Sequence, residues 1–147
     1  MATSTLIQRL ETGEGGEVSH RRQLETYISG GAITAGDVVA FSTSATGADR
    51  AATVVQAAIV ATGNALAAGV ALDSASGAGE KVRVIVAGYA EDVKCDAGVA
   101  AGDPLSVAQA TAGAVDTSVA ADLAGCFGVA LEAVAGGTVD LIVFKRF

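Results

Sequence analysis

The sequence predicts an all-β fold, a small β-barrel assembled from two sequence-similar halves and preceded by an extended N-terminal arm. Composition is the first observation behind this prediction. Of the 147 residues, 51% are hydrophobic but only 4% are aromatic, and 19 are glycine against one proline. Glycine costs about 1 kcal/mol at each interior position of a helix, whereas tight turns between strands use it readily.

A pattern that occurs twice is the second observation. Residues 69–86 and 128–143 both begin Gly-Val-Ala-Leu, continue through an acidic residue and a small-residue turn, and end in an alternating strand. An Ala-Gly-Asp motif precedes each copy, at residues 35–37 and 101–103. Equivalent glycines are 66 residues apart at this motif (36 and 102) but 59 apart at the next (69 and 128). The second copy therefore has shorter loops, where changes of length are tolerated.

These copies set the expected organisation. A chain of this length forms one domain with its own core. Two copies of about 50 residues are too few for a solenoid but can close into one barrel with pseudo-twofold symmetry. We divide the chain into an N-terminal arm, residues 1–30, and a barrel domain, residues 31–147. Within the barrel, copy one spans 33–90, copy two spans 99–147, and residues 88–96 join them.

Copy one is expected to contain four strands. Residues 37–41 follow the Ala-Gly-Asp turn and lead into paired valines. Residues 52–60 are dense in valine and isoleucine, which favours a strand, although their alanine content leaves a helix open as the alternative. Residues 69–72 form a short buried strand. In residues 81–86 every second residue is valine, which predicts a strand with its valines on one face.

Copy two is expected to repeat this order. Its strands follow the same motifs and are separated by a small-residue turn at 111–113. The expected strands are residues 102–107, 114–120, 128–131 and 138–144.

Residues 1–30 have no counterpart in the duplicated part. Residues 11–17 are too rich in glycine and glutamate for a stable element, and residues 21–29 fit either a strand or a short helix. A terminal segment of this kind is often a solvated tail. We expect instead an arm that lies on a neighbouring subunit or partner, where it can add a strand to the edge of a sheet.

Charge and hydropathy exclude several partners. The net charge of −7 argues against direct nucleic-acid binding, because phosphate recognition needs a basic face. Residues 51–72 carry no charge and are long enough to cross a bilayer, but Gly63-Asn64 marks a turn within them. We therefore expect two short segments there and no membrane contact, and the polar N-terminus predicts no secretory signal.

No catalytic constellation is predicted. The only histidine, His20, lies in the polar N-terminal segment, and no Gly-x-Ser-x-Gly elbow occurs. Asp37 and Asp103 stand at equivalent positions of the two copies, which invites a paired-acid hypothesis. However, an aspartate that closes an Ala-Gly-Asp turn accepts backbone N–H bonds there. We assign both to their turns and expect the protein not to be an enzyme.

No cofactor or metal site is expected either. Glu91, Asp92 and Asp96 form an acidic cluster, but the spacing of a calcium loop is missing. Cys95 and Cys126 lack the Cys-x-x-Cys spacing of a zinc site. Two free thiols are the favoured interpretation, and a disulfide between these cysteines stays open.

The order of the motifs resembles a known family. Ala-Gly-Asp-(Val/Pro)-(Val/Leu), Gly-Val-Ala-Leu-(Asp/Glu), a small-residue turn and a Val-x-Val-x-Val strand recur over residues 30–143. In this the chain resembles the capsid decoration or cement proteins of tailed bacteriophages, of the lambda head-decoration type and the related DUF2190 group. Residues 17–29, with Ser19-His20-Arg21-Arg22, match no motif of that family.

The resemblance implies a β-barrel or β-tulip domain that trimerises on the outer surface of the capsid in the virion. Such proteins clamp neighbouring subunits of the major capsid protein against internal pressure. The arm would lie along the capsid protein, and its implied contact residues are Thr3, Thr5, Leu6, Ile7 and Leu10. A small β-barrel module that binds a ligand or glycan is the alternative.

Overall fold

The computed structural model describes residues 22–58, 66–118 and 125–144, and the regular secondary structure of this part of the chain consists almost entirely of β-strands. The prediction of an all-β fold is confirmed. A short 3-10 turn, Gly47–Ala51, is the main exception. The strands are β1 (Gln23–Ser29), β2 (Val38–Phe41), β3 (Thr53–Gln56), β4 (Ala67–Ala71), β5 (Lys81–Lys94), β6 (Pro104–Val107), β7 (Val115–Thr117), β8 (Gly128–Ala130) and β9 (Thr138–Val143).

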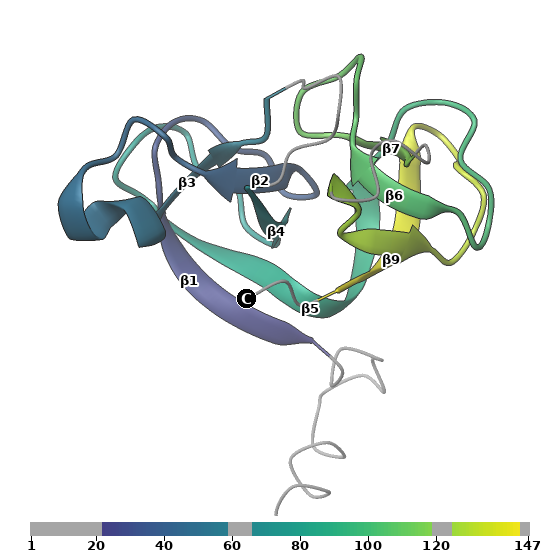
Figure 1. Cartoon of the computed structure of the whole chain (residues 1–147), viewed down its shortest axis with the longest axis horizontal. Coiled ribbons are helices and arrows are strands. Elements are labelled where there is room, and N and C mark those ends of the chain that lie inside the picture. The colour runs from purple at the N-terminus through teal and green to yellow at the C-terminus, as the bar shows by residue number, and fades with distance from the viewer. Residues whose placement is uncertain (1–21, 59–65, 119–124, 145–147) are drawn as a thin grey trace, which may run out of the picture.

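Five strands close a barrel, and four more extend the sheet outside it (Figure 1). The ring runs β1–β3–β2–β4–β5 and returns to β1, with β1 and β3 parallel and the other neighbours antiparallel. The 14-residue β5 continues beyond the ring and pairs with β9. From β9 the sheet continues through β8 and β6 to β7.

The two halves repeat one hydrogen-bonding scheme. In copy two, the C-terminal part of β5 occupies the position that β1 occupies in copy one. The Gly30 N–H donates to the Val54 carbonyl at 2.8 Å, and the Asp96 N–H donates to the Val115 carbonyl at 2.9 Å. The predicted construction from two similar halves is therefore present. However, the ring of paired strands closes within the first half, because β1 supplies its fifth strand, whereas in the second half a single parallel bridge, Cys95↔Val115, links β7 back to the end of β5.

Two segments differ from their sequence-based assignment. Residues 23–29, which the sequence pattern places in the arm, form β1, because β1 pairs with β5 from Gln23↔Ala87 to Ile28↔Lys81 and buries Tyr27. Residues 88–96, expected to join the copies, continue β5 as far as Lys94. Both segments become strands through partners distant in sequence, which local propensity does not reveal.

The core has two parts, and β2 and β4 are buried between them. One cluster fills the closed barrel, and the other fills the second half and covers the outer face of β2, β4 and β5. Val39 belongs to the first cluster and its neighbour Val38 to the second, and all five residues of β4 are buried. Layers packed from both sides leave room for small side chains only, which explains the alanine, glycine and valine content.

For residues 52–60, the sequence favours a strand and leaves a helix as the alternative. Thr53–Gln56 is a strand, β3, and residues 59–65 lie outside the described part of the chain. Among the described residues, no helix is long and apolar enough to span a bilayer.

Candidate functional site

The arm residues predicted to touch a partner, Thr3, Thr5, Leu6, Ile7 and Leu10, lie outside the described residues. The structure does describe the root of that arm. Arg22, the residue before β1, donates from Nη2 to Glu91 Oε1 at 3.0 Å. Its guanidinium carbon also lies 5.4 Å from the ring centroid of Tyr89, a cation–π distance. The side chain of Arg22 is only 11% exposed, so the arm starts from a fixed point on β5.

A hydrogen-bonded network holds this point rigid. The Tyr89 hydroxyl donates to Asp140 Oδ2 at 2.5 Å, and the Asp92 N–H donates to Asp140 Oδ1 at 3.1 Å. Asp92 has a φ of 51° and sits in a bulge where the β5–β9 register shifts. The hydrogen bond from the phenol to the Asp140 carboxylate, with burial second, raises the pKa of Tyr89 to about 12. The network thus ties the root to β5 and β9.

Both described ends of the barrel meet beside this network. Gln23, at the start of β1, pairs with Ala87, and Val143, at the end of β9, pairs with the adjacent Gly88. Two large apolar side chains next to these ends are solvent-exposed, Leu24 by 42% and Phe144 by 46%. We call the region around these paired strand ends, with Arg22, Leu24, Tyr89, Glu91 and Phe144, the β1/β9 junction.

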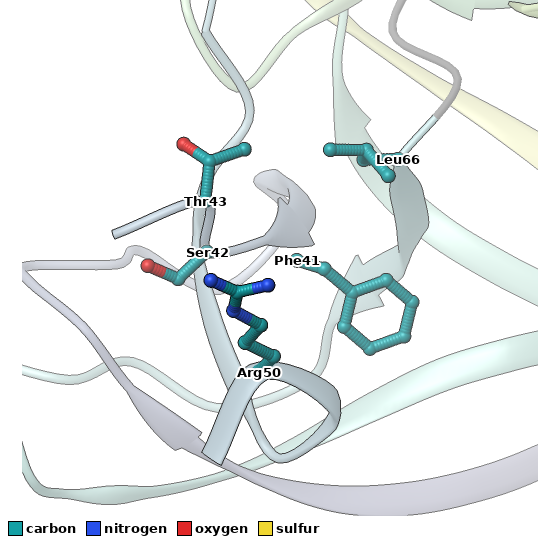
Figure 2. Close-up of a pocket in the computed structure, with 5 residues that line it drawn as sticks. All are labelled: Phe41, Ser42, Thr43, Arg50 and Leu66. Carbon is teal, nitrogen blue, oxygen red and sulfur yellow. The ribbon is translucent and has the colours of Figure 1, made fainter. Parts of the chain in front are cut away.

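A cavity opens between β2 and β4. Figure 2 shows Phe41 and Leu66 on one side of it, with Ser42 and Thr43 from the chain after β2 and Arg50 from the 3-10 turn on the other. The cavity is open to solvent and measures about 370 Å³. The Arg50 Nε donates to the Ala45 carbonyl at 3.0 Å, which positions the guanidinium. We call this cavity the β2–β3 groove, because Ser42, Thr43 and Arg50, which line it, lie between β2 and β3 in the sequence. The sequence did not predict it.

The equivalent aspartates close turns, as predicted. The Thr34 N–H donates to Asp37 Oδ2, and the Ala100 N–H donates to Asp103 Oδ2, each at 2.9 Å. Asp37 differs in being buried, and it also accepts from Gln56 Nε2 at 2.9 Å. Since each carboxylate is engaged by its own turn, the structure gives no support to a paired-acid site.

Both cysteines carry free thiols, Cys95 buried and Cys126 partly buried. Burial, with smaller contributions from Asp116 and Asp96, raises the pKa of the Cys95 thiol to about 11. This thiol therefore stays protonated and packs as a small apolar group. Within the described ranges, no three His, Cys, Asp or Glu side chains are grouped so as to hold a metal ion.

Comparison with known proteins gives one informative likeness. No protein-family model matches the chain, and no curated protein matches it. Among solved structures, the chain is similar to the crystal structure of the head fiber gp8.5 N base of bacteriophage phi29, with a TM-score of 0.59. The alignment covers 84% of this chain and 95% of that one at 18% sequence identity. At this identity the likeness establishes a shared fold.

Proposed function

We propose that the chain is a structural protein of a phage virion that attaches to the outer surface of the head. It stabilises the shell there by clamping neighbouring major capsid subunits, and it does so as a trimer. The observation that carries the proposal is the shared fold with the base of a phage head fiber over 95% of that chain. The resemblance of the motifs to capsid decoration proteins points independently in the same direction.

The geometry of the arm root supports attachment through residues 1–21. Arg22 is held by an ion pair to Glu91 and by the ring of Tyr89. A root fixed in this way gives the preceding segment a defined point of attachment to the barrel. Leu6, Ile7 and Leu10 then supply the apolar contacts of the arm with the capsid protein.

The exposed apolar side chains support self-association. Leu24, Phe144 and Leu131 are 42%, 46% and 48% exposed, although the chain is otherwise poor in large apolar groups. Large apolar side chains that a monomer leaves in water are typical of interfaces. In the trimer, a neighbouring subunit covers the β1/β9 junction.

Co-sedimentation with expanded phage heads that lack this protein tests attachment. The full chain should pellet with the heads to saturation, whereas a chain lacking residues 1–16 should remain in the supernatant while keeping its thermal melting temperature. A chain in which Leu6, Ile7 and Leu10 are replaced by serine is the matched control of equal length, and it should bind as poorly as the truncation. Saturating binding by the truncated chain would refute the arm's role, and failure of the full chain to bind would refute attachment itself.

Size-exclusion chromatography with light scattering tests the trimer. The protomer mass is 14.3 kDa, so a trimer elutes at about three times that mass, independently of capsids. Replacing both Leu24 and Phe144 by serine should shift the trimer toward monomer. A full chain that stays monomeric at micromolar concentrations would contradict a stable trimer.

The β2–β3 groove is a specific observation in favour of the second candidate function, a module that binds a ligand or glycan. A cavity of this size is typical of small-molecule sites. This activity is compatible with attachment to a capsid, since the groove and the β1/β9 junction share no residue.

A further inference from the structure

The internal duplication separates what the fold requires from what has been added to it. After β2, the Ser42 N–H donates to the Thr53 carbonyl, and after β6 the equivalent Ala108 N–H donates to the Ala114 carbonyl. Between these anchors lie residues 43–52 in copy one but only 109–113 in copy two. Five residues are enough to connect the strands, so the longer loop is not needed for the barrel.

The short loop of copy two serves the framework. Gly113 donates its N–H to the Ala57 carbonyl and accepts a hydrogen bond from the Val38 N–H at 2.7 Å. The adjacent Ala112 carbonyl accepts from Lys94 Nζ at 3.1 Å. The two bonds of Gly113 join the two halves, and the bond from Lys94 ties the loop to the end of β5. The long loop of copy one instead places the 3-10 turn and Arg50 at the rim of the groove (Figure 2).

The groove combines three kinds of chemistry. The three ion pairs found among the described residues do not involve Arg50, and its side chain is exposed. Its Nε is bound to Ala45, which leaves the terminal nitrogens to face an acceptor. The hydroxyls of Ser42 and Thr43 both donate and accept, and Phe41 and Leu66 offer apolar contact. Phe41 is braced from behind by the Tyr27 ring, edge to face at 5.7 Å.

We propose that the β2–β3 groove binds an acidic monosaccharide unit, a hydroxylated ring that carries a carboxylate. Arg50 forms a bidentate pair with the carboxylate, the geometry that a guanidinium fork favours. Ser42 and Thr43 exchange hydrogen bonds with ring hydroxyls, and the apolar face of the ring packs on Phe41. A volume of about 370 Å³ accommodates a ligand of this size. This binding does not depend on attachment to a capsid.

Titration of the ¹⁵N-labelled full chain tests the proposal by amide chemical-shift changes. Glucuronate, glucose and acetate are the probes, because glucose has the ring without the carboxylate and acetate has the carboxylate without the ring. Glucuronate should shift the amides of Ser42, Thr43 and Arg50 saturably. Glucose and acetate should each bind about tenfold more weakly, since each lacks one set of contacts.

Two arginine variants complete the test. Arg50→Gln should weaken glucuronate binding about tenfold and leave the melting temperature unchanged. Arg83→Gln is the matched control, because Arg83 is an exposed arginine already paired with Asp73 at 2.7 Å. The affinity of this variant for glucuronate should stay unchanged. Absence of saturable shifts in the groove, or equal affinity of Arg50→Gln and the parent chain, would overturn the proposal. If the chain bound acetate as tightly as glucuronate, the groove would be a simple anion site and the assignment to a sugar would be overturned.

Discussion

Gly69 offers the sharpest test of why the Gly-Val-Ala-Leu motif occurs twice. In β4, a Cβ added at residue 69 would lie 2.1 Å from the carbonyl oxygen of Ile85 and 2.9 Å from its carbonyl carbon, both backbone atoms of β5. At the equivalent Gly128, the added Cβ would lie 2.7 Å from the carbonyl oxygen of Ile142 in β9. The glycine that begins each Gly-Val-Ala-Leu motif therefore lets two paired strands approach each other.

The loss of unfolding free energy in Gly69→Ala depends on whether β4 and β5 can move apart to relieve the overlap. β4 is buried on both faces, so β4 and β5 cannot separate into solvent. Overpacking of this kind costs about 1–3 kcal/mol, and loosening the adjacent Val70↔Ile85 pairing adds about 1 kcal/mol for a lost hydrogen bond. We expect about 2–4 kcal/mol for Gly69→Ala, a large part of the 5–15 kcal/mol typical of a domain. For Gly128→Ala, where the overlap is smaller, we expect about 1–2 kcal/mol.

Urea unfolding followed by far-UV circular dichroism measures these differences from midpoints and slopes. Gly77→Ala is the matched control, because an added Cβ there meets nothing within 4 Å, and its midpoint should be unchanged or slightly higher. A Gly69→Ala midpoint equal to that of Gly77→Ala would refute the steric explanation of the repeated motif.

The remaining predictions concern hydrogen-bonded polar side chains. Asp37→Ala should cost about 2–4 kcal/mol of unfolding free energy, because it leaves Gln56 and a turn N–H without their acceptor. Asp103→Ala, in the equivalent turn of copy two but partly exposed, should cost about 1 kcal/mol in the same urea assay, and equal costs would contradict the role of burial. Tyr89 should ionise near its pKa of about 12, measured by absorbance at 295 nm in a Tyr27→Phe background that leaves it the only tyrosine. Since the folded pKa is raised above 10, this hydrogen bond stabilises the fold fully below pH 10 and is lost as the pH rises toward 12; Asp140→Asn should lower the pKa, and an unchanged titration would exclude Asp140 as the cause.

Much of the fold could be predicted because its signals are local. Alternation in residues 81–86 and the short apolar run at 69–72 correspond to β5 and β4, and the Ala-Gly-Asp motifs do form turns around Asp37 and Asp103. A turn is set by a few neighbouring residues, and an alternating strand by its own pattern. These turns and strands can therefore be predicted without knowing which other strands they pair with.

The closure of the barrel could not be predicted in the same way. β1 and the C-terminal part of β5 hold equivalent places, yet their buried residues differ, Tyr27 in one and Val93 in the other. A strand position requires only that alternate side chains be buried, so the two segments share almost no sequence. The duplication thus extends further in structure than in sequence, and its first strand lies in the segment that the sequence assigns to the arm.

The groove was missed because its residues meet only through strand pairing. Phe41 and Leu66 are 25 positions apart in sequence and come together because β2 pairs with β4. The sequence feature related to the groove is the shrinking offset between the copies, most of which reflects the longer loop of copy one. Loop length alone indicates tolerance of insertions. Only the position of Arg50 beside Phe41 gives that insertion a chemical meaning.

Duplication also predicts that stability and function are carried by different residues. Features present in both copies, such as the Ile33–Ala75 and Val99–Val134 contacts, maintain the barrel. Features present once, the loop with Arg50 and the segment before Arg22, are not required by the repeated scheme. Changes at the former should lower the melting temperature and reduce binding only through unfolding. Changes at the latter should abolish binding in a chain that melts normally, so measuring both quantities on each variant separates the framework from the two proposed binding regions.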